Sequence, residues 1–214
     1  MPPPNLHRRR RLAEAATHVL AEGGSRGLTH RAVDAFAGVP AGTTSRYFRN
    51  RDALFVAVTE YAISTHLDDL GEELGAAPAG GRLTCDDLVE LLVQTARAAV
   101  GEQRFRHLAV AELFLESNRR PALREAMTAA ARQHRESLGA LFAAAGVPLD
   151  ELAARRLVAF IDGMLFSALA EFRTAPAEVA QDMVEALVRD ELATFLGDRP
   201  DRLTGCSALP APAR

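Results

Sequence analysis

The feature that most constrains the fold of this chain is a sharp break between two helical patterns, at Gly38-Val39-Pro40. A helix is expected over residues 29–37, because Thr29 is a good N-cap and apolar side chains follow it at helical spacing. Gly38 can adopt the left-handed conformation that ends a helix, and Pro40 prevents the first helix from continuing. A second short helix is expected over residues 41–48, so the sequence predicts helix, tight turn, helix.

The second of these helices carries side chains suited to reading DNA. They are small hydrogen-bonding groups and one cation, namely Gly42, Thr43, Thr44, Ser45 and Arg46. Glycine permits close approach of the backbone, hydroxyls bond base edges or phosphates, and arginine can bind guanine O6 and N7 together. A phosphate contact by Arg46 is an equal alternative. The pattern therefore predicts a DNA-reading helix-turn-helix.

Residues 8–60 resemble the N-terminal domain of the tetracycline-repressor (TetR) family of bacterial transcription regulators. The resemblance is carried by Gly38-Val39, Gly42-Thr43, Tyr47-Phe48 and Arg51-Asp52, all in register. The family commonly has an apolar residue where this chain has Thr44, and tyrosine where it has Ser45. The resemblance implies that Tyr47 and Arg51 contact phosphates, while Phe48 is expected in the core. It also implies a homodimer that binds double-stranded operator DNA and responds to a small-molecule effector.

The distribution of charge supports a DNA-binding head. The first 51 residues hold nine arginines and three acidic residues, whereas the rest of the chain holds sixteen arginines and twenty-five acidic residues. A basic head on an acidic body is typical of a protein whose head faces phosphates. Arg8 and Arg9 are candidate phosphate or minor-groove contacts, although their run of arginines also fits a solvated helix start. Thr29 and His30, at the start of the first reading helix, are further candidates for phosphate contact.

The rest of the chain predicts an all-α fold, because no sustained alternation of β-branched residues indicates a strand. Apolar periodicity and capping signals predict helices over residues 8–22, 29–37, 41–48, 52–74, 85–100, 103–117, 121–145, 149–173 and 176–196. The first three form a helix-turn-helix domain, residues 8–51, and six more form an effector-binding and dimerisation domain, residues 52–197. The proline-containing ends, residues 1–7 and 198–214, are expected to be disordered, and residues 75–82 to form a loop.

Family members bind an effector among their body helices, so the resemblance implies a pocket there. The candidate lining residues are Phe105, His107, Phe114, His134, Phe142 and Met164. Core packing or solvent exposure is the simpler explanation for each of them. The two histidines are the better polar candidates, because their sequence neighbours are apolar.

Two apolar stripes near the C-terminus predict a dimer interface. Candidate contacts are Leu157, Phe160, Ile161, Met164, Leu165 and Ala168 on one helix, and Val179, Met183 and Leu187 on the next. A helical hairpin doubled by a two-fold axis forms a four-helix bundle. Packing within one chain is the alternative explanation. One short recognition helix reads few bases, which favours a two-fold pair.

The sequence thus predicts a homodimeric, ligand-responsive transcription regulator, most simply a repressor. A helix-turn-helix that serves as a protein interface without binding DNA is the alternative. No nucleophile elbow, phosphate loop or metal-ligand spacing points to an enzyme, a cofactor or a metal site. With no membrane span or secretory signal, and two distant cysteines (Cys85 and Cys206) that predict no disulfide framework, the chain is expected to be cytoplasmic.

Overall fold

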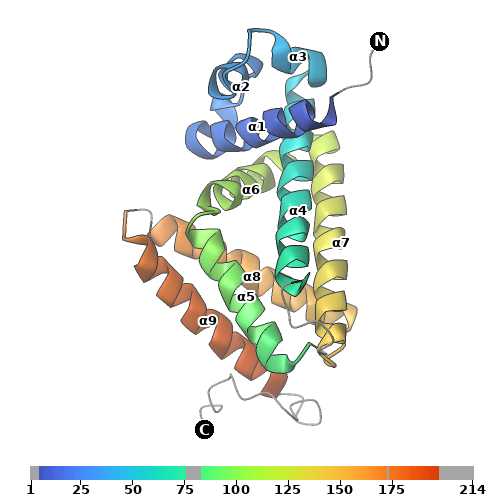
Figure 1. Ribbon diagram of the computed structural model, residues 1–214, viewed down its shortest axis with the longest axis vertical. Coiled ribbons are helices and arrows are strands. Elements are labelled where there is room, and N and C mark those ends of the chain that lie inside the picture. The colour runs from blue at the N-terminus through green and yellow to red at the C-terminus, as the bar shows by residue number, and fades with distance from the viewer. Residues whose placement is uncertain (1–4, 76–82, 173, 198–214) are drawn as a thin grey trace. The chain divides into compact units, whose positions relative to one another are not determined.

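The computed structural model describes residues 5–75, 83–172 and 174–197, and the expectations for residues 1–4, 76–82 and 198–214 lie outside this part of the chain. Every regular element in the described part is a helix, so the all-α prediction is confirmed. The helices are α1 (Leu6–Gly27), α2 (His30–Phe36), α3 (Thr43–Tyr47), α4 (Arg51–Gly75), α5 (Cys85–Val100), α6 (Arg104–Ser117), α7 (Pro121–Ala144), α8 (Glu151–Glu171) and α9 (Ala177–Gly197) (Figure 1). Most of their boundaries lie within two residues of those predicted.

The largest difference is at α1, which begins before the predicted start at Arg8. The side chain of Asn5 accepts a hydrogen bond from the backbone N–H of Arg8 at 3.1 Å. This cap satisfies an otherwise orphaned donor of the first turn, so Leu6 and His7 are helical instead of disordered. At the other end, Gly24 has φ of +61° and breaks the helical path. The helix resumes after Gly24 and α1 ends at Gly27, five residues beyond the predicted end at Glu22, although the break itself lies at the predicted Gly23-Gly24.

The described helices pack as two compact units. Unit 1 comprises Met1–His66 and Phe105–Arg132, and unit 2 comprises Leu67–Arg104 and Gln133–Arg214. The core of unit 1 explains why it extends beyond the predicted domain boundary at residue 51. Fully buried side chains from four helices share this core, namely Leu12 and Leu20 of α1, Leu54 and Phe55 of α4, Leu113 of α6 and Leu123 of α7. The helix-turn-helix motif therefore has no separate core, because α4, α6 and α7 complete it.

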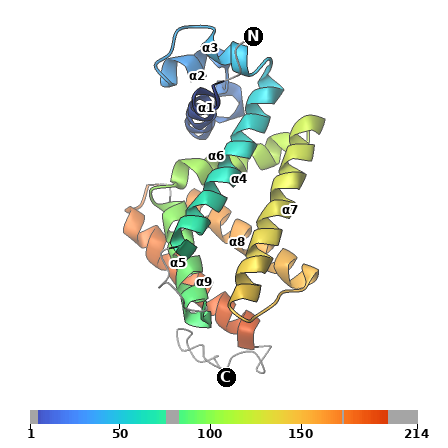
Figure 2. The ribbon, with the colours of Figure 1, turned by 45° about the vertical axis from the view of Figure 1, so that its right-hand side comes forward.

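In unit 2, α5 and α9 run side by side (Figures 1 and 2). The start of α5 is fixed by a capping box in which Thr84 and Asp87 satisfy each other's backbone N–H groups. Along the pair, Arg97 bonds Glu185 at 2.8 Å, and Arg189 bonds Glu90 at 2.9 Å. These contacts lie beside an apolar core and fix the register of the two helices.

The described residues bear on the expectations for the cysteines and for a membrane span. Cys85 is disulfide-bonded, which corrects the expectation that the two cysteines form no disulfide. Its possible partner in the sequence, Cys206, lies outside the described residues. None of the described helices combines the length and apolar composition that a membrane span requires.

Candidate DNA-binding and effector sites

The turn between α2 and α3 has the geometry that the sequence predicted. Thr29 caps α2, since its hydroxyl oxygen accepts a hydrogen bond from the N–H of Ala32 at 3.1 Å. Gly38 and Gly42 have φ of +64° and +84°, a region that side-chain-bearing residues rarely occupy. The two glycines allow the chain to leave α2 and start α3 within a few residues.

Asp34 is the residue that fixes α3 against α2. Its side chain is buried, and its carboxylate accepts hydrogen bonds from the N–H of Gly42 at 2.7 Å, the N–H of Thr44 at 2.7 Å and the hydroxyl of Thr44 at 2.6 Å. Burial alone would raise the pKa of Asp34, but the hydrogen bonds from Thr44 and Gly42 outweigh it and the pKa is lowered. A five-residue helix is not stable alone, so this carboxylate supplies much of what holds α3 in place.

Asp34 was not among the residues predicted from the sequence, although a signal was present. Asp34 directly follows the core residue Val33, in a helix too short to offer a long polar face. A charged residue at such a position needs partners, and the orphaned N–H groups at the start of the next helix provide them.

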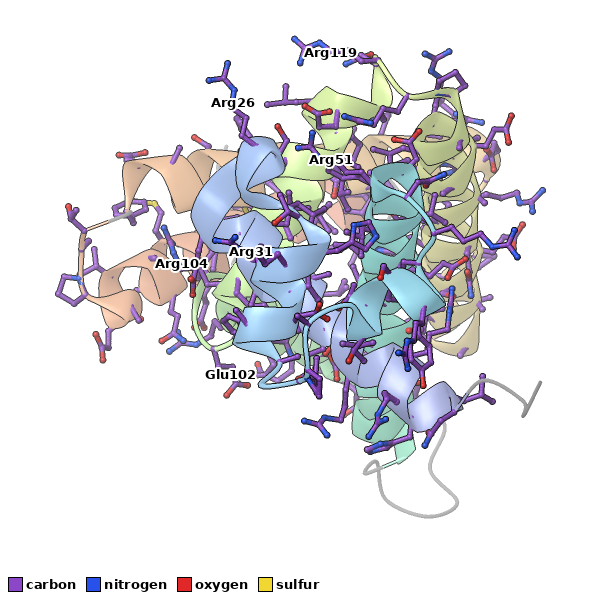
Figure 3. The ribbon with its side chains drawn as sticks, turned by 90° about the horizontal axis from the view of Figure 1, so that it is seen from above. Arg26, Arg31, Arg51, Glu102, Arg104 and Arg119 are labelled. Carbon is purple, nitrogen blue, oxygen red and sulfur yellow. The ribbon has the colours of Figure 1, made fainter. Side chains whose placement is uncertain are left out.

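Five residues in or directly beside α2 and α3 are exposed, and we call this set the reading surface: Thr29, Arg31, Ser45, Arg46 and Arg49. Within the described part of the chain, no ion pair engages the three arginines of this reading surface. The hydroxyl of Ser45 donates to the carbonyl of Gly42 at 2.9 Å, which leaves its oxygen lone pairs to accept from a base or a bound water. Figure 3 looks down on this part of unit 1 and labels Arg31. Arg49 was not among the predicted contacts, because it lies just beyond the expected second helix.

Thr44, His30 and Arg51 were predicted to contact DNA, and their side chains bond other groups of unit 1. Thr44 is fully buried against Asp34, which contradicts the expectation of a side chain facing the bases. A ring nitrogen of His30 lies 2.7 Å from the carbonyl oxygen of Phe48. The guanidinium of Arg51 donates to the carbonyl of Ser25 and lies over the ring of Phe55, so it faces inward instead of toward phosphates (Figure 3).

The other predicted contacts keep some exposure. Gly42 and Arg8 are exposed, whereas Thr43 and Tyr47 are partly buried. The hydroxyl of Thr43 donates to the carbonyl of Pro40 at 2.6 Å. Arg9 pairs with Glu60 at 3.0 Å and lies over the ring of Phe48, 5.4 Å from its centroid. Phe48 itself is 2% exposed, which confirms its predicted place in the core.

The residues predicted to line an effector pocket are divided between the units. Phe105, His107 and Phe114 belong to unit 1, and His134, Phe142 and Met164 to unit 2. Phe105 stacks on His18 with 3.8 Å between ring centroids, and Phe142 is fully buried with its ring edge-on to Phe195, so both have packing roles. Phe114 is 48% exposed, which does not fit a pocket wall. Burial lowers the pKa of His134, which favours its neutral form.

Asp162 on α8 was not among the residues predicted from the sequence. It is partly buried, and no hydrogen bond or ion pair joins it to another described residue. Burial raises its pKa to about 6, with no opposing charge to lower it. The sequence signal was an acidic residue on the inward side of an apolar helix, between the buried residues Val158 and Leu165. A carboxylate in this state is suited to a cationic ligand.

A groove of about 430 Å³ runs between α8 and α9 within unit 2. Its walls include Phe160, Gly163, Met164, Ser167, Met183 and Leu187. The predicted interface residues on α9 are exposed, with 48% of the surface of Val179, 45% of Met183 and 41% of Leu187 accessible to solvent. Met183 and Leu187 line the groove. On α8, Phe160 and Ile161 are partly exposed, and the unpredicted Phe166 is 57% exposed.

Four predicted interface residues are already buried within the protomer. Leu157, Leu165 and Ala168 belong to the core of unit 2, and Met164 contributes to the groove with only 7% of its surface exposed. The apolar stripe of α8 is wider than one interface requires, because one side of it packs inside unit 2. This divides the predicted set into core residues and surface residues.

Comparison with known proteins agrees with this architecture. Residues 12–58 match the model of bacterial regulatory proteins of the tetR family, and residues 83–190 match that of the tetracyclin repressor-like C-terminal domain. A comparison with curated proteins found no match.

Several solved structures are similar over most of their length. The multidrug binding protein EbrR complexed with ethidium is 31% identical, over 88% of this chain and 99% of that one, with a TM-score of 0.60. EbrR complexed with proflavin is 32% identical, over 85% and 99%, with a TM-score of 0.51. A TetR family member from Streptomyces coelicolor A3 is 32% identical, over 85% and 97%, with a TM-score of 0.59.

The motif, the helical order and these matches agree over both the N-terminal and the C-terminal parts of the chain. The chain belongs to the TetR family of bacterial regulatory proteins, which are DNA-binding regulators responsive to small molecules and not enzymes.

Proposed function

We propose that this protein is a homodimeric transcriptional repressor that leaves its operator when an organic cation binds. The observation that carries the DNA-binding part is the reading surface, Thr29, Arg31, Ser45, Arg46 and Arg49. Its arginines have no ion-pair partner among the described residues. Asp34 fixes α3, the helix that carries Ser45 and Arg46. Cations held on a rigid surface bind phosphates and base edges with little loss of side-chain order.

The dimer rests on the apolar side chains at the α8–α9 groove. Val179, Met183 and Leu187 recur on one side of α9, and each exposes at least two fifths of its surface. A second copy related by a two-fold axis would cover them with the same residues, giving a four-helix bundle. Such a dimer presents two reading surfaces to a palindromic operator. One short α3 helix alone would contact only half of such an operator.

The class of effector is proposed from Asp162 together with the relatives. EbrR, at 31–32% identity, was crystallised with ethidium and with proflavin, and both are planar organic cations. In this chain Asp162 is a partly desolvated carboxylate with no ion-pair partner among the described residues, and a cation that displaced its remaining water would stabilise the ionised form. We therefore expect an aromatic or quaternary cation in contact with Asp162.

The test is binding to duplex DNA from upstream of the protein's own gene, with scrambled DNA as the control, across a salt series. The proposal predicts tight, sequence-dependent binding by a dimer, with affinity falling steeply as salt rises. Addition of proflavin is expected to weaken specific binding by about 5-fold to 150-fold, the usual range of coupling between two sites. Weak binding to every duplex, including fragments selected from the whole genome, would favour a helix-turn-helix that serves as a protein interface.

A further inference from the structure

Ser25 occupies the corner that connects α1 to the reading helices. It follows Gly24, whose φ of +61° ends the helical path of α1, and it precedes Thr29, the cap of α2, by four residues. A carbon atom added to Gly24 would lie 3.6 Å from the carboxylate of Glu112, so α6 approaches this corner closely. The position of Ser25 thus influences where α2 begins.

Groups from α4 and α6 hold both polar atoms of the Ser25 backbone. Its N–H donates to Glu112 of α6 at 3.1 Å, and its carbonyl accepts from the guanidinium of Arg51 at the start of α4. A further hydrogen bond joins Ser25 to the carboxylate of Glu116, one turn along α6. We name these contacts of Glu112, Glu116 and Arg51 with Ser25 the Ser25 clamp.

The clamp is supported by a second layer of contacts. Arg120 bonds Glu116 at 2.9 Å and also bonds Asp52, and its guanidinium lies 4.7 Å from the centroid of the Phe55 ring. The hydrogen bond from Arg120, together with that from Ser25, lowers the pKa of Glu116 despite its burial. Glu116 is 9% exposed and stays ionised at neutral pH, so this is not a loose surface ion pair.

A separate aromatic contact ties the start of α6 to the same motif. The ring of His18 is stacked between Phe105 of α6, at 3.8 Å, and Phe36 at the end of α2, at 5.1 Å. Helix α6 therefore contacts α1 near both of its own ends, through Phe105 on His18 and through the Ser25 clamp, and His18 of α1 in turn contacts Phe36 of α2.

We propose that Glu112 and Glu116 are positioning residues for DNA binding, because through the Ser25 clamp they fix the place of α2 and the reading surface. The inference rests on the proposed DNA-binding function. It gives α6 a link to the reading helices through the Ser25 corner of α1, in addition to the covalent path through α4. It also gives Arg51 a role inside the clamp in place of the phosphate contact that the family resemblance implied.

The direction in which DNA affinity changes distinguishes the clamp from a general effect of net charge. Removing an acidic side chain from a DNA-binding unit normally strengthens DNA binding, since the phosphates are negative. Removing Glu112 is expected to weaken it, because the loss of a positioned α2 outweighs the gain in net charge. The salt dependence should stay the same, since no phosphate contact is lost.

The experiment compares the full-length Glu112→Ala, Glu112→Gln and Glu125→Ala variants with the unmodified protein. Glu125 is an exposed acidic residue of α7 in the same unit, so it controls for the change in net charge. Affinity for the upstream duplex would be measured by fluorescence anisotropy at several salt concentrations, with exchange of the Ser25 amide followed by NMR or mass spectrometry. We expect Glu112→Ala to bind DNA about tenfold more weakly with an unchanged salt slope, which is the effect of losing one hydrogen bond to a charged acceptor.

Glu112→Gln keeps an oxygen acceptor for the Ser25 N–H, so it should recover affinity to within about twofold. Glu125→Ala should bind as tightly as the unmodified protein or more tightly. The Ser25 amide should exchange faster in Glu112→Ala alone. Equal or tighter DNA binding by a folded Glu112→Ala variant, or unchanged Ser25 exchange, would overturn the clamp.

Arg51→Met gives a second test if Glu112→Ala does not fold. The clamp predicts weaker DNA binding with an unchanged salt slope, whereas loss of a phosphate contact would reduce the slope by about 0.9 and overturn the clamp. If the unmodified protein binds no duplex at all, the proposed function fails. The Ser25 exchange rates in the variants would still decide whether the clamp exists.

Discussion

Replacement of Asp34 is the sharpest test of how the reading surface is held. In Asp34→Ala, the N–H groups of Gly42 and Thr44 and the hydroxyl of Thr44 all lose their acceptor. A hydrogen bond to a charged group contributes about 1.5–3 kcal/mol, and part of the loss is recovered by water at the exposed Gly42. We expect the free energy of unfolding to fall by about 4 kcal/mol, a large share of the roughly 5–15 kcal/mol typical of a folded protein.

Asp34→Asn should be milder, because its amide oxygen can still accept from Thr44. Its NH2 group then faces the N–H of Gly42, so two donors meet and the Gly42 N–H has lost its acceptor. The expected cost is about 2 kcal/mol, from one lost charge-assisted hydrogen bond. Urea unfolding followed by circular dichroism measures both variants, and Asp190→Asn, at an exposed position on α9, is the matched control.

The pH dependence of the free energy of unfolding is an independent test of the role of Asp34. The pKa of Asp34 is lowered below 3.8 in the folded protein, so its ionised form contributes stability above that pH. This contribution is lost as the pH falls through the lowered folded value. The stability difference between the unmodified protein and Asp34→Asn should therefore be constant near neutral pH and shrink below about pH 4. A difference that is absent at neutral pH, or that grows in acid, would refute the anchoring role of Asp34.

Three further predictions concern the proposed sites. Asp162→Asn should raise the free energy of unfolding by about 1–3 kcal/mol above pH 6, because the pKa of Asp162 is raised to about 6 and its ionised form destabilises the free protein. The same variant should bind proflavin more weakly in a fluorescence titration. A free energy of unfolding that is no higher than that of the unmodified protein at any pH would contradict this. Leu187→Glu should shift the dimer toward monomer in analytical ultracentrifugation, while Leu115→Glu, at an exposed site on α6, should not. Arg46→Ala and Tyr47→Ala should each abolish specific duplex binding in a gel-shift assay with the dimer intact; an operator affinity and salt slope equal to the unmodified protein would refute that assignment.

Local signals in the sequence were sufficient for the helices and for the turn. Capping at Thr29, the left-handed Gly38 and the break at Pro40 act within a few residues, so they could be recognised without knowing the packing. Contacts between residues far apart in the sequence could not be predicted from such local signals. Nothing near Glu112 in the sequence indicates that its carboxylate meets the backbone of Ser25, because the two are 87 residues apart.

Periodicity also could not separate an interface from a core. The stripe of α8 contains both Leu157, which is 1% exposed, and Phe166, which is 57% exposed, and both occur in the same apolar run of the sequence. A hydrophobic pattern identifies the sides of a helix that avoid water, but it does not say whether the same chain or a second copy covers them.

The two departures of α3 from the family pattern have different physical consequences. Thr44 replaces a commonly apolar residue at a fully buried position, and its hydroxyl is satisfied at 2.6 Å by Asp34, so the departure is explained inside the protein. Ser45 replaces a common tyrosine at an exposed position, where its hydroxyl donates back to Gly42. Only the second departure alters the exposed reading surface, and in the proposed complex a small hydroxyl in place of a phenol would let the backbone of α3 approach the bases more closely. Ser45→Tyr should therefore change which duplexes are bound, whereas Thr44→Val should lower stability by about 1 kcal/mol and leave the preferred sequence unaltered.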